Sequence, residues 1–309
     1  MSLDFDKILN DCGVYKEDSS KVLKKISELE EFYDTTDLIK IYNYILKTVK
    51  NYDILSGVIK LTDYHKDIST LLLLSDILLK KNITLSDSEE IVNLRILCAK
   101  AISNYKDSST VGILLNCLNN KNENYKIRLA CADALGRIGD KYAVAPLINV
   151  VNDEDEKSIY VKESAAFALG LIGDTCAIEP LAAIIEAKQG LLDKFAFLKE
   201  KVVEALGKIN INNSRVLQAF KISLTDSSPM VRISTIEALM NSEYEEAPEL
   251  IKKSLHDEND EVQKNALIAL YNIIGRDILD EVISLPGYSN SLKKEAQDLI
   301  DEYEDSTDE

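Results

Sequence analysis

Two stretches decide the fold: IRLACADALGRIGD at residues 127–140 and VKESAAFALGLIGD at residues 161–174. Each is followed by a related segment, AVAPLI at residues 143–148 and AIEPLA at residues 177–182. The two blocks align without a gap at a period of 34 residues. A fixed period of this length indicates stacked copies of one structural unit, in which each copy contacts its neighbours.

Weaker copies of the pattern extend on both sides. Their central alanines are spaced 33, 34, 37, 33 and 31 residues apart, at Ala101, Ala134, Ala168, Ala205, Ala238 and Ala269. We therefore expect repeats over residues 91–285. Residues 1–90 are predicted to be an N-terminal helical cap or degenerate repeats, and residues 286–309 a C-terminal helix and an acidic tail. An insertion within residues 186–199 holds Phe195 and Phe197, which form either a rim contact or the packing of a longer helix.

Each unit is predicted to be a pair of helices. The first helix, of about 12 residues, has Pro146 or Pro180 near its start, where the missing N–H is harmless. A turn rich in Asp and Asn follows. The second helix has apolar residues at i, i+4, i+7 and i+8, beginning for example at Val161, which makes one buried stripe. Gly139 and Gly173 lie where second helices end, the usual place for a positive φ.

The pattern Arg-x-x-Ala-x-x-Ala-Leu-Gly-x-Ile-Gly-Asp-x-x-Ala-x-x-Pro-Leu resembles the short HEAT repeats of phycobilin lyase subunits and their relatives. The resemblance is strong over residues 127–181 and weaker over residues 94–275. It implies an all-α fold, a right-handed α-α superhelix (solenoid) of HEAT-like helix pairs. The motif is specific for this fold and unspecific for function.

Charge and composition restrict the partners. The formal net charge is −17, with 36 Lys and Arg against 53 Asp and Glu. This balance argues against a broad face that neutralises nucleic-acid phosphates, and against binding to an anionic membrane surface. The N-terminus has no basic region followed by an apolar stretch, and the longest apolar run, at residues 71–74, is too short to span a bilayer. We expect a cytoplasmic protein without a membrane segment.

The sequence offers little catalytic chemistry. The five cysteines form no CxxC pair, and Cys98, Cys131 and Cys176 lie at helical core spacing, which predicts reduced core residues. His65 and His256 are the only histidines, and both are predicted to be surface turn residues. Neither is followed by Glu, so the His-Glu pairs of the helical-repeat enzyme deoxyhypusine hydroxylase are missing. We predict no catalytic residue, no metal site and no cofactor.

One position of the second helix is repeatedly cationic. It is occupied by Arg95, Arg128, Lys162, Lys199 and Arg232, and Asp107, Asp140 and Asp174 lie about twelve residues after the first three. In proteins with this pattern such residues tend to form ladders between neighbouring units. Two interpretations remain: ion pairs that link successive repeats, or a basic stripe that binds an acidic ligand.

The second helix of each pair usually lines the inner, concave face of such an array. Positions between the core residues vary from repeat to repeat, and several are apolar where a solvated face would be polar. The residues predicted to bind a partner are Leu129, Asp133, Arg137, Glu163, Phe167, Leu171, Glu204, Lys208, Ile233 and Ile268. Phe167 is either the energetic centre of this surface or a residue buried between repeats.

The function predicted first is a non-enzymatic scaffold or adaptor that binds a protein through the concave face. The alternative is an accessory subunit or enzyme related to the phycobilin lyases, although no residue identifies a tetrapyrrole site. Nucleic-acid binding is third, because of the net acidity. The sequence does not indicate which protein binds or how many copies assemble.

Overall fold

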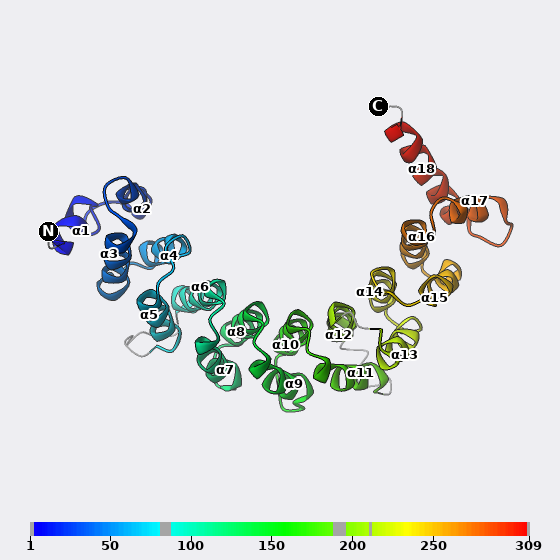
Figure 1. The fold of residues 1–309 in the computed structure, drawn as a ribbon, viewed down its shortest axis with the longest axis horizontal. Coiled ribbons are helices and arrows are strands. Elements are labelled where there is room, and N and C mark those ends of the chain that lie inside the picture. Colours follow the sequence, from blue (N-terminus) through cyan, green and yellow to red (C-terminus); the bar gives the residue numbers. More distant parts are fainter. Residues whose placement is uncertain (1–2, 81–87, 188–195, 210–211, 308–309) are drawn as a thin grey trace. The chain divides into compact units, whose positions relative to one another are not determined.

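The computed structural model describes residues 3–80, 88–187, 196–209 and 212–307, and every regular element in these ranges is a helix (Figure 1). Successive helices pack in pairs, so the predicted all-α solenoid is confirmed. The chain divides into two compact units, Met1–Pro146 and Leu147–Glu309, with the boundary inside helix α9 (Val144–Asn152). Phe195 lies outside the described residues.

The first unit contains two rows of helices. Its helices are α1 (Phe5–Asp11), α2 (Ser19–Glu28), α3 (Thr35–Thr48), α4 (Tyr52–Leu61), α5 (Ile68–Leu78), α6 (Glu89–Tyr105), α7 (Val111–Asn119) and α8 (Tyr125–Ile138). Helices α2, α4, α6 and α8 pack one against the next, and α3 packs against α5. The proposed division at residue 90 stays a prediction.

The second unit repeats the arrangement. It contains α10 (Ile159–Ile172), α11 (Ile178–Glu186), α12 (Ala196–Ile209), α13 (Ser214–Ser223), α14 (Pro229–Met240), α15 (Ala247–Lys253), α16 (Asp260–Ile274), α17 (Asp277–Ser284) and α18 (Asn290–Thr307). Helices α10, α12, α14 and α16 pack successively and are called here the inner row, and α11, α13 and α15 lie on the other side (Figure 1). Helices α17 and α18 pack against α16.

Local sequence signals place the helix ends as predicted. Pro146 and Pro180 are each the third residue of their helix, where the backbone N–H has no partner within the helix. Gly139 and Gly173 end α8 and α10 with φ of +77° and +72°, a conformation that side chains disfavour. Both predictions are confirmed.

Buried cations link successive repeats. Arg95 donates to both carboxylate oxygens of Glu123, at 2.9 and 2.6 Å. Arg232 does the same with Asp257, at 2.8 and 2.6 Å. The ammonium of Lys199 donates to Asp226 at 2.7 Å. The acceptors follow their donors by 28, 25 and 27 residues, so each bond joins one repeat to the turn of the next.

Asp107, Asp140 and Asp174 were predicted to take part in such ladders, but they are not the acceptors for these three cations. Asp107, Asp140 and Asp174 instead begin short 3-10 turns, where each carboxylate accepts the backbone N–H two residues later, at 2.8, 2.8 and 2.9 Å. This bond begins the turn in each of the three repeats, which explains why Asp recurs at this position. Repeat-to-repeat pairing is therefore the correct interpretation for Arg95, Lys199 and Arg232, whose side chains are buried and cannot form a surface stripe.

Two further expectations about single residues were wrong. Cys98 and Cys131 are buried as predicted, but Cys176 is exposed, because it lies in the turn Thr175–Ala177 that begins the next helix. His256 is exposed as predicted, whereas His65 is half-buried with its Nε2 3.2 Å from Glu30 Oε1. No helix in the part of the chain that the structure describes is long and apolar enough to cross a bilayer.

The Arg95–Glu123 pair predicts how stability depends on pH. Burial raises the pKa of Glu123, but hydrogen bonds from Arg95 and from the Asn124 backbone, with the Arg95 charge, outweigh burial and lower the pKa below its ordinary value. The ionised pair therefore stabilises the fold fully above the unfolded-state pKa of about 4.3, and this contribution is lost as the pH falls through the lower folded-state pKa.

We expect Glu123→Gln to reduce the free energy of unfolding at pH 7, with a difference from the wild type that shrinks below about pH 4. Urea unfolding at several pH values measures the loss of stability at pH 7 and its decrease at lower pH. Glu90→Gln, at an exposed position on α6, is the control and should leave the pH profile unchanged. A Glu123→Gln penalty that is equally large at pH 3 and pH 7 would contradict the prediction.

Candidate functional site

Small residues bring the inner-row helices of the second unit close together. A Cβ atom at Gly170 on α10 would lie 2.7 Å from the Cα of Ala205 on α12. A Cβ at Gly207 on α12 would lie 3.1 Å from the Cβ of Ala238 on α14. Because the backbones approach so closely, the solvent-exposed faces of α10, α12 and α14 lie directly beside one another.

The residues predicted to bind a partner fall in both units. In the first unit they lie on α8, where Leu129 and Asp133 are half-buried and Arg137 is exposed. In the second unit they lie on successive inner-row helices: Glu163, Phe167 and Leu171 on α10, Glu204 and Lys208 on α12, Ile233 on α14 and Ile268 on α16. All of these keep part of their side chain accessible, and Leu171 and Ile268 are 40% and 38% exposed. Their role in binding stays a prediction.

Three of these side chains, those of Phe167, Glu204 and Lys208, meet across α10 and α12, together with Lys201. The ammonium of Lys208 lies 5.1 Å from the centre of the half-buried Phe167 ring, within the range of a cation–π contact. The same ammonium donates to Glu204 at 2.9 Å, and Lys201 donates to the other oxygen of Glu204 at 2.8 Å. Phe167 is therefore not buried between repeats, but its outer face is covered by a lysine that is itself ion-paired.

A groove lies between α12 and α14 beside this contact, with a volume of about 550 Å³. We call it the inner-row groove. It is lined by Glu200, Lys201, Glu204, Gly207, Lys208, Ser234, Glu237, Ala238 and Asn241. Gly207 and Ala238 were not predicted as site residues, although Gly207 ends one copy of the repeated Ala-Leu-Gly pattern and Ala238 is a central alanine of the next repeat. Because small residues stand at these positions, the longer charged side chains around them enclose a hollow.

Glu163 is placed on α10 close to the charged end of the groove. Burial raises the pKa of its carboxyl group, with the Lys201 charge acting in the opposite direction and the Glu200 charge adding to the increase. Among the described residues Glu163 and Glu237 have no ion-pair partner. Two carboxylates at this surface are thus available to a ligand that carries positive charge.

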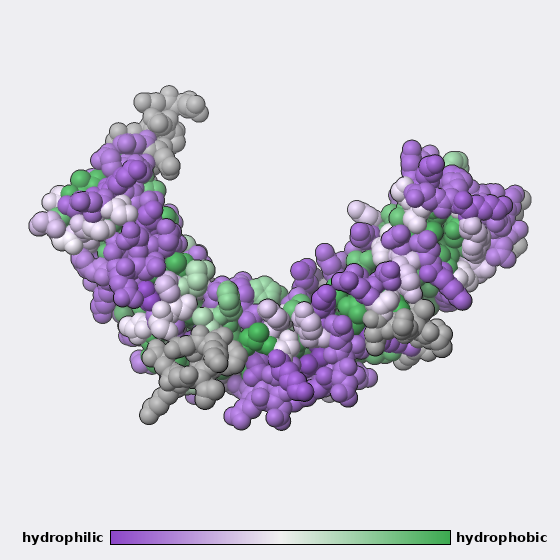
Figure 2. Space-filling model, turned by 180° about the vertical axis from the view of Figure 1, so that it is seen from behind, coloured by the Kyte–Doolittle hydropathy of each residue, from purple (hydrophilic) through white to green (hydrophobic). Residues whose placement is uncertain are grey.

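The apolar residues predicted to bind a partner do not line the groove. Phe167, Leu171, Ile233 and Ile268 occupy α10, α14 and α16, whereas the groove itself is mainly polar and charged. Figure 2 shows apolar surface as small separate patches on a face that is mostly hydrophilic. The second unit therefore offers isolated apolar contacts beside charged side chains.

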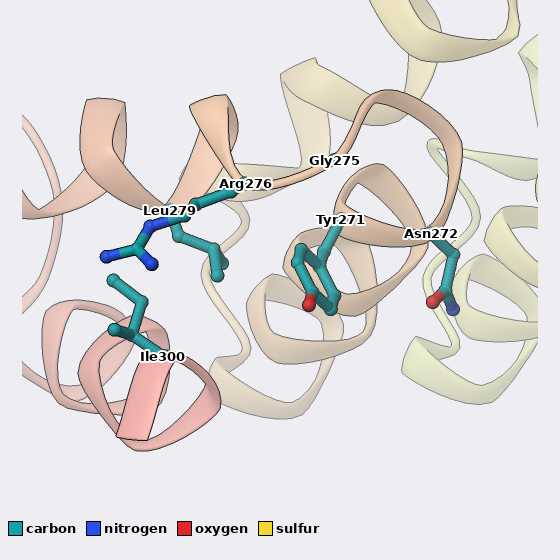
Figure 3. Close-up of a pocket in the computed structure, with 6 residues that line it drawn as sticks. All are labelled: Tyr271, Asn272, Gly275, Arg276, Leu279 and Ile300. Atoms are coloured by element: carbon teal, nitrogen blue, oxygen red, sulfur yellow. The ribbon is translucent and has the colours of Figure 1, made fainter. Parts of the chain in front are cut away.

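A second pocket lies at the C-terminal end of the second unit, with a volume of about 410 Å³. Figure 3 shows Tyr271 and Asn272 on α16, Leu279 on α17 and Ile300 on α18, with Gly275 and Arg276 between α16 and α17. No sequence pattern predicted this pocket, because it depends on how the last two helices pack against α16. Its charged residue, Arg276, has its Nε 3.9 Å from Asp280.

Neither pocket has a His or Cys side chain among the described residues that line it. Within the described ranges no three or more His, Cys, Asp or Glu side chains are grouped so that they could hold a metal ion. The inner-row groove can form ion pairs, hydrogen bonds and an aromatic contact, which are the interactions of a binding surface.

Comparisons with solved structures agree with the fold. The chain is similar to Kap121p, with 12% identity, a TM-score of 0.51, and 94% of this chain and 36% of that chain covered. It is also similar to the complex of CpcE and CpcF of phycocyanin lyase from Nostoc sp. PCC7120, with 22% identity, a TM-score of 0.44, and 75% and 94% coverage. Human deoxyhypusine hydroxylase in complex with glycerol matches at 16% identity, a TM-score of 0.38, and 87% and 97% coverage.

Kap121p is the match that supports the solenoid fold, and the chain spans about a third of its length. No curated protein sequence matches the chain. The family model described as HEAT repeats matches residues 81–158, 113–196 and 186–271, which together make up more than half of the sequence. The predicted resemblance is confirmed, and the chain belongs to the HEAT-repeat family.

Proposed function

We propose that the chain is a non-enzymatic scaffold or adaptor that binds a protein partner through the inner row of its second unit. The observation that carries this proposal is the surface formed by Phe167, Lys208 and the inner-row groove. It combines an aromatic ring, charged side chains of both signs and a hollow of about 550 Å³ on a continuous helical face. A few residues near the centre of a protein interface supply most of its binding energy, and large aromatic side chains are frequent among them.

The repeat architecture supports the same function. Core positions, such as Ala165 and Leu169 on α10, are fully buried and hold the stack together. The residues between them contribute little to the buried core, so they can differ from repeat to repeat and can be specific for one partner. Each repeat of the second unit contributes a different set of side chains to a surface whose backbone stays regular.

We expect Phe167→Ala to weaken binding of the native partner by about 2 kcal/mol or more, roughly thirtyfold. Its effect on the melting temperature should be small, because the ring is only half-buried. Affinity capture from the native cell extract, with retained proteins quantified by mass spectrometry, measures the loss of a specific partner.

The matched control is Phe32→Ala, which removes a ring that is 76% exposed in the first unit. A protein retained by the wild type and Phe32→Ala but lost with Phe167→Ala supports the proposal. If Phe167→Ala retains every protein that the wild type retains, the proposed surface is wrong. A large loss of stability in Phe167→Ala with unchanged binding would contradict it as well.

A further inference from the structure

Resting on the proposed function, we propose that the inner-row groove takes an arginine-bearing peptide segment of the partner, whose guanidinium replaces the Lys208 ammonium on the Phe167 ring.

The first support is the charge around the groove. Four glutamates and two lysines, namely Glu163, Glu200, Glu204, Glu237, Lys201 and Lys208, leave a formal net charge of −2 there. Glu204 is already paired with both lysines, at 2.8 and 2.9 Å. Lys201 also lies 4.0 Å from Glu200, so the excess negative charge lies on Glu163 and Glu237, and a segment with positive side chains complements it.

The second support is the covering of Phe167 by a cation from its own chain. The Lys208 ammonium lies 5.1 Å from the ring centre, which shows that this face of the ring accepts a positive group. The Lys208 side chain is 37% exposed, so it can leave the ring without unfolding α12. A planar guanidinium stacks on an aromatic ring better than an ammonium does and binds a carboxylate with two hydrogen bonds.

The third support is the position of the unpaired carboxylates. Glu163 precedes Phe167 by one helical turn on α10, and Glu237 lines the far wall of the groove on α14. A cation on the ring and a second cation in the groove would each meet a carboxylate that has no ion-pair partner among the described residues. The same acidity opposes a nucleic acid, whose phosphates need lysine and arginine contacts.

The test uses the full-length protein and a fluorescent glycine-spaced peptide with two arginines. In a matched peptide, citrulline replaces both arginines, which keeps the shape and removes the charge. Fluorescence anisotropy measures the affinities of the wild type and of three variants. Glu163→Gln/Glu237→Gln removes the groove carboxylates, Glu154→Gln/Glu258→Gln removes the same charge from exposed turns, and Lys208→Met uncovers the ring.

We expect the arginine peptide to bind the wild type and the turn variant alike, and the groove variant about fivefold to tenfold more weakly. Lys208→Met should bind it more tightly, and the citrulline peptide should bind more weakly than the arginine peptide. Equal weakening in both double variants, equal binding of the two peptides, or weaker binding by Lys208→Met would each overturn the proposal.

This outcome is distinguishable from failure of the proposed function. If Phe167→Ala loses its native partner while the arginine peptide does not bind, the surface binds a protein whose contacts are not cationic. Tighter binding of a single-stranded oligonucleotide than of the arginine peptide, in low salt, would overturn the inference in favour of a nucleic-acid partner.

Discussion

Lys199→Met is expected to lower the free energy of unfolding by about 3–5 kcal/mol, because it leaves a buried carboxylate without its counter-ion. The Lys199 side chain is 2% exposed, Asp226 is 9% exposed, and their charged atoms are 2.7 Å apart. Asp226 also accepts the backbone N–H of Ser228 at 2.9 Å, so it cannot turn away to reach water without breaking the turn before α14.

Urea unfolding followed by circular dichroism measures this loss. Lys221→Met, which replaces an exposed lysine on α13, is the control and should change stability by less than about 0.5 kcal/mol. Adding Asp226→Asn to Lys199→Met should restore part of the stability, because the amide keeps an acceptor for Ser228 and removes the unpaired charge. Equal effects of Lys199→Met and Lys221→Met would show that the buried pair contributes nothing.

Gly170→Ala is expected to destabilise the protein by about 1–3 kcal/mol, although alanine is the better helix former. The added methyl group would lie 2.7 Å from the Cα of Ala205, and a backbone atom cannot rotate away as a side chain can. Helices α10 and α12 would have to separate, which would loosen the layer that carries Phe167 and Lys208.

The same substitution one repeat later provides the comparison. At Gly207 the added methyl group would meet the Cβ of Ala238 at 3.1 Å, so a smaller shift suffices and a smaller loss is expected. Replacing Ala205 by Gly in the Gly170→Ala background should recover little, because the Cα of residue 205 remains in place. A Gly170→Ala protein as stable as the wild type would contradict the close approach of these helices.

The sequence predicted the fold well because its signals are local and repeated. The apolar spacing from Val161, the prolines near helix starts and the glycines at helix ends each depend on a few neighbouring residues. These local features favour the same helices whatever the conformation of distant parts of the chain. The 34-residue period then determines which helices stack.

The ion pairs and the groove depend on contacts between repeats, and here the sequence was less informative. The acceptor is Glu at position 123 and Asp at positions 226 and 257, and its distance from the donor varies between 25 and 28 residues. Asp107, Asp140 and Asp174 are more regularly spaced, because each accepts a backbone N–H at the start of a short turn. The contact between the Lys208 ammonium and the Phe167 ring depends on one side-chain conformation, which a repeat pattern in the sequence does not predict.

Asp226 and Arg232 show what one repeat carries. Asp226 receives the cation of the preceding repeat, and Arg232, six residues later, donates to Asp257 of the following repeat. A duplicated gene segment that encodes one repeat would therefore encode both the acceptor for the preceding repeat and the donor to the following one. Evolution can lengthen or shorten such an array by whole repeats. A deletion that removes the acceptor but keeps its donor would leave a buried charge without its counter-ion.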